Sequence, residues 1–230
     1  MKEGIILFLS TIAVGSLAFP LAGKVKNAIK LLLSFSGAFL LAICALHILP
    51  DVYESHTENV GLFVLLGFLF QIMLEFYSQG TEHGHAHYHG HAKKIPLGIV
   101  VSLCIHAFFE GLPFGFHEAA HESYLLGIIL HKMPVAFVLT SLLIGHQLKK
   151  SITFILLALF ALMPALGSLV VGYTDVIADY YPYVMASVLG MMLHISTTIL
   201  FEVSENHQFN RIKFTSVILG FLSAYLVLHH

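Results

Sequence analysis

Long blocks of apolar residues alternate with short polar connections along the chain. A helix rises about 1.5 Å per residue and the hydrocarbon core of a bilayer is about 30 Å thick, so about 20 consecutive apolar residues are enough to cross it. Eight blocks have this length, at residues 4–22, 29–50, 59–78, 96–116, 123–145, 152–173, 181–202 and 212–229. The pattern therefore predicts an all-α membrane protein with eight transmembrane helices in a single bundle.

The composition agrees with this interpretation. Of the 230 residues, 57% are hydrophobic and 10% are charged, whereas about 25% of the residues in a soluble domain are charged. Eight spans with short connections use the whole length, so we expect one transmembrane domain over residues 1–230, embedded in the lipid bilayer. The first apolar block is poor in basic residues and lacks a convincing cleavage site, which favours a span over a signal peptide. No basic patch indicates a nucleic-acid partner.

The lysine and arginine residues predict the orientation, because cytoplasmic connections of membrane proteins are enriched in them. Nine of the 11 lie in the connections after the first, third, fifth and seventh spans, and Lys2 lies on the opposite side. We therefore expect a multi-pass protein of the cell membrane, with these basic connections in the cytoplasm and both termini extracellular or periplasmic.

The fourth and fifth spans carry ionisable residues near their middle, with His106 and Glu110 in the fourth and His131 and Lys132 in the fifth. Counted from the turn near Ala119, His106 lies 13 residues before and His131 lies 12 residues after, so both imidazoles reach a similar depth near the midplane. Ionisable groups at this depth are costly and usually functional. Two imidazoles and a carboxylate predict a metal site, and they suit Zn²⁺ or the similar ions Fe²⁺, Mn²⁺, Co²⁺ and Cd²⁺.

Lys132 places an ammonium group at the same depth, which is tolerable only if the group is paired or neutral. Glu110 is the nearest plausible partner, and Lys132 could then take the place of a second cation and leave room for a single metal. Alternatively, Lys132 points toward a water-filled cavity and only sets the local electric field. Both interpretations are open at this point.

Each of these two spans also contains a proline, Pro113 or Pro134. Proline has no backbone N–H, so each one is expected to free a carbonyl, that of Phe109 in the first case and of Leu130 in the second. Transporters use loosened helices of this kind to offer additional oxygen ligands.

Further candidates lie toward the ends of other spans. His47 and Asp51, one turn apart in the second span, could form a vestibule where cations enter, or could be interfacial polar residues. In the seventh span, His194 could make an outer-shell contact with the metal or a helix-to-helix hydrogen bond. Glu202 could receive a cation at the cytoplasmic exit or belong to a solvated helix end.

A histidine-rich segment follows the third span, and we expect it to form a cytoplasmic loop at about 79–95. Histidine occupies every second position of its centre, at His83, His85, His87, His89 and His91. Such tracts bind transition metals, although a disordered linker rich in glycine and histidine has the same composition. The segment lies outside the apolar core and is therefore not the mid-membrane site. Gln71 and Glu75 precede it on a common face of the third span.

These motifs resemble the ZIP (Zrt-/Irt-like protein) family of divalent metal transporters. HAFFEG at 106–111 is similar to the family's H-N/S-x-x-E-G signature, and HKMP at 131–134 is similar to its H-x-x-P element. LLAICALHILPD at 40–51 resembles its G-x-F-L-x-x-x-x-H-x-x-P-E/D segment. The resemblance implies transport of Zn²⁺ or a similar metal into the cytoplasm, with the metal as substrate and no required cofactor.

The resemblance also assigns residues. His106, Glu110 and His131 match positions that bind the transported metal. Many family members hold a second metal with an asparagine after the first histidine and with carboxylates in the fifth span, and the corresponding residues here are Ala107, Lys132 and Val135. A single metal with Lys132 near Glu110 is therefore expected. The family is thought to alternate access by moving the bundle that holds the fourth and fifth spans, and the chain could form a homodimer.

Two other classes of function are alternatives. An intramembrane zinc-dependent hydrolase would also place histidine and glutamate at membrane depth, to activate water for lipid or peptide cleavage, but the chain has no HExxH pair. A metal sensor or storage protein would be built around the histidine-rich segment.

Deletion of residues 82–91 separates the transporter from the sensor. For a transporter, we expect the deletion to change the rate or regulation of uptake and to leave transport intact, because the mid-membrane ligands remain. The measurement is radiolabelled zinc uptake into vesicles by the wild type and the deletion variant. Complete loss of uptake in a folded variant would favour the sensor or storage protein.

Overall fold

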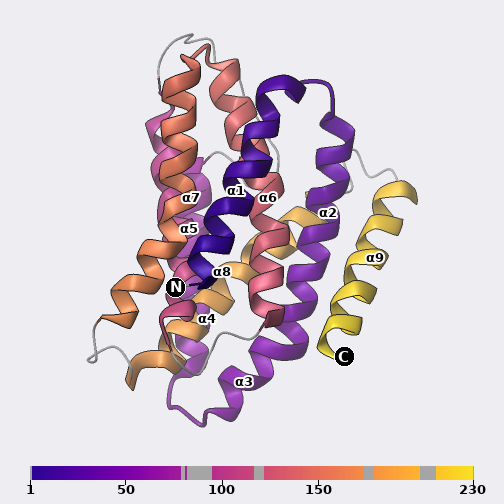
Figure 1. Ribbon diagram of the computed structural model, residues 1–230. Coiled ribbons are helices and arrows are strands. Elements are labelled where there is room, and N and C mark those ends of the chain that lie inside the picture. Colours follow the sequence, from indigo (N-terminus) through magenta and orange to yellow (C-terminus); the bar gives the residue numbers. More distant parts are fainter. Residues whose placement is uncertain are drawn as a thin grey trace.

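A computed structural model describes residues 2–78, 81, 95–116, 122–173, 179–202 and 211–229 of the chain (Figure 1). Over these residues it contains eight helices that are long and apolar enough to cross a membrane. The predicted all-α fold with eight transmembrane helices is therefore confirmed. The elements are α1 (Lys2–Leu21), α2 (Lys26–Ile43), η1 (Cys44–Ile48), α3 (Leu49–Glu54), α4 (Val60–Ser78), α5 (Leu97–Gly111), η3 (Leu112–Gly115), α6 (Glu122–Gly145), α7 (Lys150–Gly172), α8 (Tyr181–Glu202) and α9 (Arg211–Leu228).

The second span is longer than its apolar block predicts. α2 continues through the π-helical turn η1 into α3, so the span reaches from Asn27 to Glu54 and does not end at Pro50. Pro50 lies in the first turn of α3, and the π-helical turn directly before it places the Leu49 N–H on the carbonyl of Cys44. The wider turn accommodates a proline ring that would clash with the backbone of a regular α-helix.

The fourth span changes helix type at its end. α5 is α-helical to Gly111, and η3, which contains Pro113, is a 3₁₀-helix. The backbone N–H of Leu112 donates to the carbonyl of Phe109. The prediction that Pro113 frees this carbonyl is therefore wrong, because the tighter 3₁₀ geometry supplies another donor. α6, by contrast, runs through Pro134 as one helix.

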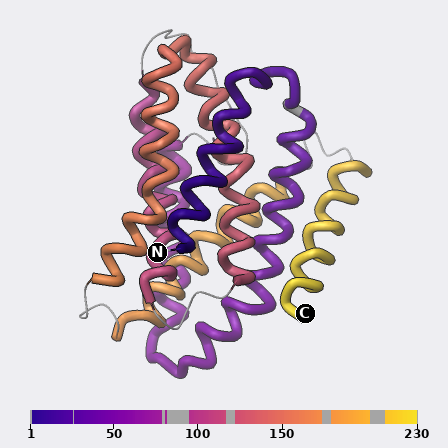
Figure 2. The backbone as a smooth tube through the Cα atoms, in the orientation of Figure 1, coloured from indigo at the N-terminus to yellow at the C-terminus, as the bar shows by residue number. Residues whose placement is uncertain are grey.

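The helices pack as two groups (Figures 1 and 2). The α6 group consists of α1, α5, α6 and α7, and the α8 group consists of α2, α4, α8 and α9. The two groups meet where α6 packs on α2 and α5 packs on α4. α6 lies deepest: 72% of its most apolar window is buried, compared with 11% for α9. Side chains at the middle of α6 are therefore held in the protein interior and not in lipid.

Glycines bring helix backbones into direct contact within each group. A Cβ atom on Gly190 of α8 would lie 1.9 Å from the carbonyl oxygen of Val64 on α4. A Cβ atom on Gly111 of α5 would lie 2.1 Å from the carbonyl oxygen of Pro164 on α7. Small residues permit such close approach in membrane bundles. The backbones of α4 and α8 in one group, and of α5 and α7 in the other, are thus joined at van der Waals distance.

The border between the groups is less tight at Gly127, where α6 faces α2. A Cβ atom there would lie 3.6 Å from the nearest heavy atom, in the side chain of Leu40, which is an ordinary contact distance.

Alanine substitutions at the two kinds of glycine should differ in effect. Gly190→Ala forces α4 and α8 apart, and overpacking of this kind costs about 1–3 kcal/mol. For a chain of this size we expect the thermal midpoint to fall by roughly 2–12 °C. Gly127→Ala is the matched control and should leave the midpoint unchanged or higher. Thermal unfolding of the purified proteins in detergent measures both, and equal midpoints for the two variants would contradict the packing described here.

Candidate metal site

α5 and α6 bring three metal-binding side chains together in the interior. His106 and Glu110 lie one turn apart on α5, and His131 lies on α6. One ligand atom from each residue lies within 4.8 Å of the others. All three side chains are only 1% or 2% exposed. We call this set the His–Glu–His cluster, and it is the only group of three or more such residues found over the described part of the chain.

Two distances between ligand atoms of the cluster bracket the spacing that a tetrahedral metal ion requires. Nε2 of His106 lies 3.1 Å from Oε1 of Glu110, and Nε2 of His131 lies 3.9 Å from the same oxygen. The two imidazole rings are nearly perpendicular, with centroids 6.0 Å apart. A zinc ion about 2.1 Å from each ligand separates tetrahedral ligand atoms by roughly 3.4 Å, which falls between the two observed distances. With three protein ligands, a tetrahedral ion would keep a fourth position open for exchange.

The second oxygen of Glu110 faces Lys132. Nζ of Lys132 lies 2.5 Å from Oε2 of Glu110, and the lysine side chain is 1% exposed. The same nitrogen lies 4.5 Å from the centre of the Phe160 ring on α7. The two oxygens of the carboxylate therefore have different partners: Oε1 faces the two histidines and Oε2 faces the ammonium. In this structure Lys132 is paired with Glu110.

Two residues that the sequence did not point to also hold this region. The hydroxyl of Tyr124 donates to the backbone carbonyl of Glu110 at 3.0 Å, and Tyr124 is buried. Phe160 lies under the Lys132 ammonium. A tyrosine at the start of an apolar span is expected at the membrane interface, and a phenylalanine in an apolar block carries no polar signal. Their roles depend on tertiary contacts alone.

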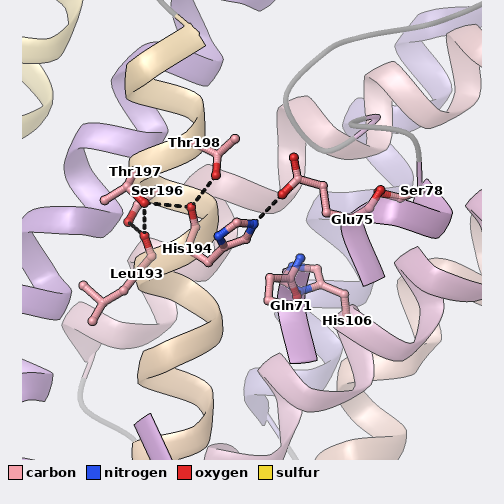
Figure 3. Close-up of polar contacts among 9 residues, drawn as sticks. All are labelled: Gln71, Glu75, Ser78, His106, Leu193, His194, Ser196, Thr197 and Thr198. Atoms are coloured by element: carbon pink, nitrogen blue, oxygen red, sulfur yellow. Dashed lines mark hydrogen bonds and ion pairs between the residues drawn. The ribbon is translucent and has the colours of Figure 1, made fainter. Parts of the chain in front are cut away.

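Gln71 and Glu75, one turn apart on α4, contact two histidines of other helices (Figure 3). Oε1 of Gln71 lies 3.2 Å from Nδ1 of His106. Oε2 of Glu75 forms a hydrogen bond with Nε2 of His194 of α8, and both side chains are partly exposed. His194 thus makes a contact between helices α8 and α4. The contact with Gln71 reaches the His–Glu–His cluster from the other group of helices.

The remaining candidates lie elsewhere. Nδ1 of His47 lies 3.5 Å from Oδ2 of Asp51, in η1 and α3, and the two side chains are 22% and 46% exposed. They do not join the cluster. The Glu202 side chain and the five loop histidines, His83, His85, His87, His89 and His91, lie outside the described residues.

Eight helices that are long and apolar enough to cross a membrane, around a buried His–Glu–His cluster, define a polytopic membrane protein with a candidate metal site. The model of the ZIP zinc transporter family matches residues 78–228, and the chain therefore belongs to this family. ZIP proteins are transporters and not enzymes, which argues against the hydrolase alternative.

One curated protein is also similar to this chain. Protein zntD of Dictyostelium discoideum is 28% identical over an alignment of 163 residues, and the match covers 62% of this chain and 24% of that protein. The chain thus spans about a quarter of the length of this relative.

Replacing Lys132 by methionine tests the buried ion pair. Removing one partner of such a pair costs about 3–5 kcal/mol because the other charge is left uncompensated. We expect the thermal midpoint of the metal-free protein to fall by roughly 6–20 °C, and added zinc to restore most of it by neutralising Glu110.

The double variant Lys132→Met/Glu110→Gln is the matched control, since it removes both charges. It should lose less stability than Lys132→Met alone. If metal-free Lys132→Met unfolded at the wild-type temperature, the ion pair would not be the stabilising contact described here.

Proposed function

We propose that the chain carries Zn²⁺, or a similar divalent transition metal, across the membrane into the cytoplasm. The metal binds at mid-membrane to His106, Glu110 and His131. The observation that carries this proposal is the convergence of these ligands in the buried centre of an eight-helix member of the ZIP family. Two imidazoles and one carboxylate suit zinc, and Fe²⁺, Mn²⁺, Co²⁺ and Cd²⁺ are alternative substrates because ligand type separates these ions weakly.

We propose one metal per site. A second divalent ion on the far side of Glu110 would meet the Lys132 ammonium, which lies 2.5 Å from Oε2. Two unit charges about 4 Å apart repel by about 4 kcal/mol at an effective dielectric constant of 20, and a divalent ion doubles this. Lys132 therefore takes the place of the second cation and directs Oε1 of Glu110 toward the histidines.

The grouping of the helices supports alternating access. Both histidines, Glu110 and Lys132 lie on α5 and α6, and Phe160 lies on α7, so the whole site belongs to the α6 group. Tight glycine contacts join α5 to α7 within this group. We propose that the α6 group moves as a unit against the α8 group and exposes the site to each side in turn.

The direction of transport follows from the proposed orientation. In Figure 1 the α1–α2 connection lies at the upper end of the bundle and α3 lies at the lower end. Both termini lie in the lower half of the view, nearer to α3 than to that connection. With the lysines of that connection in the cytoplasm, α3 and the His47–Asp51 pair lie on the extracellular side, where the pair forms a vestibule for cations. A membrane potential of 100 mV, negative inside, then favours inward movement of a divalent ion by about 4.6 kcal/mol.

We also propose roles for two features on the cytoplasmic side. Glu202 lies at the exit, and the histidine-rich loop binds metal weakly after release. The chain acts as a single transmembrane unit in this proposal.

Flux measurements test the assignment directly. We expect radiolabelled zinc to enter proteoliposomes that contain the wild type, and we expect His106→Ala and Glu110→Ala to reduce uptake to the level of empty vesicles. His56→Ala, which removes an exposed imidazole, is the matched control and should transport normally. Uptake should also fall in acid, because protons compete with the metal for the same ligands. Absence of flux in the wild type would contradict the proposal.

A further inference from the structure

Gln71 is a buried amide on α4 that contacts the His–Glu–His cluster from outside (Figure 3). Its side chain is fully buried, and its Oε1 lies 3.2 Å from Nδ1 of His106. The other ring nitrogen of His106, Nε2, lies 3.1 Å from Oε1 of Glu110. One nitrogen of the ring therefore faces α4 and the other faces the cluster.

The chemistry of the amide decides where the ring carries its proton. An amide oxygen only accepts hydrogen bonds, so Nδ1 must be the N–H donor in this contact. A neutral imidazole with its proton on Nδ1 has its lone pair on Nε2. A metal ion needs this lone pair, and Nε2 is the atom that faces Glu110.

The other tautomer would make the ligand atoms unavailable to a metal ion. A neutral His106 with its proton on Nε2 would donate to Oε1 of Glu110, which lies within hydrogen-bond distance. Both ligand atoms would then be occupied by one hydrogen bond. An acceptor opposite Nδ1 opposes this arrangement. In the orientation that the structure shows, the Gln71 oxygen would face the lone pair of Nδ1, and the amide would have to turn over to offer its NH₂ group instead.

We propose that Gln71 is a positioning residue, which selects the Nδ1–H tautomer of His106 and so keeps Nε2 available to the metal. The inference rests on the proposed function and assigns a residue that binds no metal itself. Contacts of this kind behind a metal ligand are typically worth 10- to 100-fold in metal affinity.

The position of Gln71 adds a second consequence. Gln71 belongs to the α8 group and His106 belongs to the α6 group, so their hydrogen bond crosses the border between the groups. α4 is joined to α8 by the Gly190 contact and by the Glu75–His194 hydrogen bond, one turn from Gln71. When the α6 group moves, Gln71 remains with the α8 group. Metal affinity is therefore highest in the conformation that contains the Gln71–His106 hydrogen bond and lower in the conformation in which this bond is broken. Release of the metal is thereby coupled to the movement of the α6 group.

Two substitutions separate positioning from packing. Gln71→Met keeps a side chain of similar length and removes the acceptor. Gln71→Glu keeps an acceptor but adds a buried charge. If Gln71 only filled space, Met would be the milder change, because burying a charge costs more than burying a thioether. If Gln71 positions His106, Glu is the milder change for zinc binding.

The measurement is the dissociation constant for Zn²⁺, by calorimetry on the full chain in detergent, together with KM and maximal rate in proteoliposomes. We expect Gln71→Met to raise the dissociation constant and KM by about 10- to 100-fold, and Gln71→Glu to stay within about threefold of the wild type. Ser78→Ala, on the same helix and also buried, is the matched control and should bind as the wild type does.

Nitrogen NMR of histidine-labelled protein gives a readout that packing does not change. The His106 signals, assigned by their loss in His106→Ala, should show the proton on Nδ1 in the wild type and on Nε2 in Gln71→Met. If Gln71→Met binds zinc as tightly as the wild type, or keeps the proton on Nδ1, this inference is wrong while the transport assignment stands. If the wild type itself binds no zinc, the proposed function fails instead.

Discussion

The two oxygens of the Glu110 carboxylate organise the centre of this protein. One faces the imidazoles of His106 and His131, and the other faces the Lys132 ammonium. An uncompensated carboxylate at this depth would cost several kcal/mol, so the ion pair is what allows the ligand to exist in the interior. The pair in turn depends on its surroundings, since the ammonium lies against the Phe160 ring on a third helix.

The division of the helices into two groups allows the buried site to move relative to half of the bundle. The cluster and its counter-ion lie on helices of the α6 group, in which Gly111 brings the backbones of α5 and α7 into contact. In the α8 group, Gly190 brings the backbones of α4 and α8 into contact in the same way. Between the groups the contacts include ordinary side-chain packing at Gly127 and the hydrogen bond that Gln71 accepts from His106 of the cluster. Such an arrangement permits the site to move as a unit while its environment changes around it.

Much of this architecture follows from the sequence, because a bilayer imposes simple rules. Apolar blocks of sufficient length predict the spans, and counting residues from a turn predicts that His106 and His131 reach the same depth. The deviations at Pro50 and Pro113 were harder to foresee, since the backbone had two ways to accommodate each ring, by a wider turn or by a tighter one. The Gln71–His106 contact depends on how α4 is rotated, and a helix that is apolar on nearly every face does not reveal its rotation. Phe160 and Tyr124 gain their roles only from what the fold places beside them.

The central claim is that a single divalent ion is held by Glu110 and the two histidines while Lys132 keeps the other carboxylate oxygen. Anomalous diffraction from crystals grown with cadmium or zinc tests it most directly. We predict one ion per chain, bound to Nε2 of His106, Nε2 of His131 and Oε1 of Glu110, with Lys132 still against Oε2. An empty cluster, or two ions sharing Glu110 with Lys132 displaced, would contradict the account.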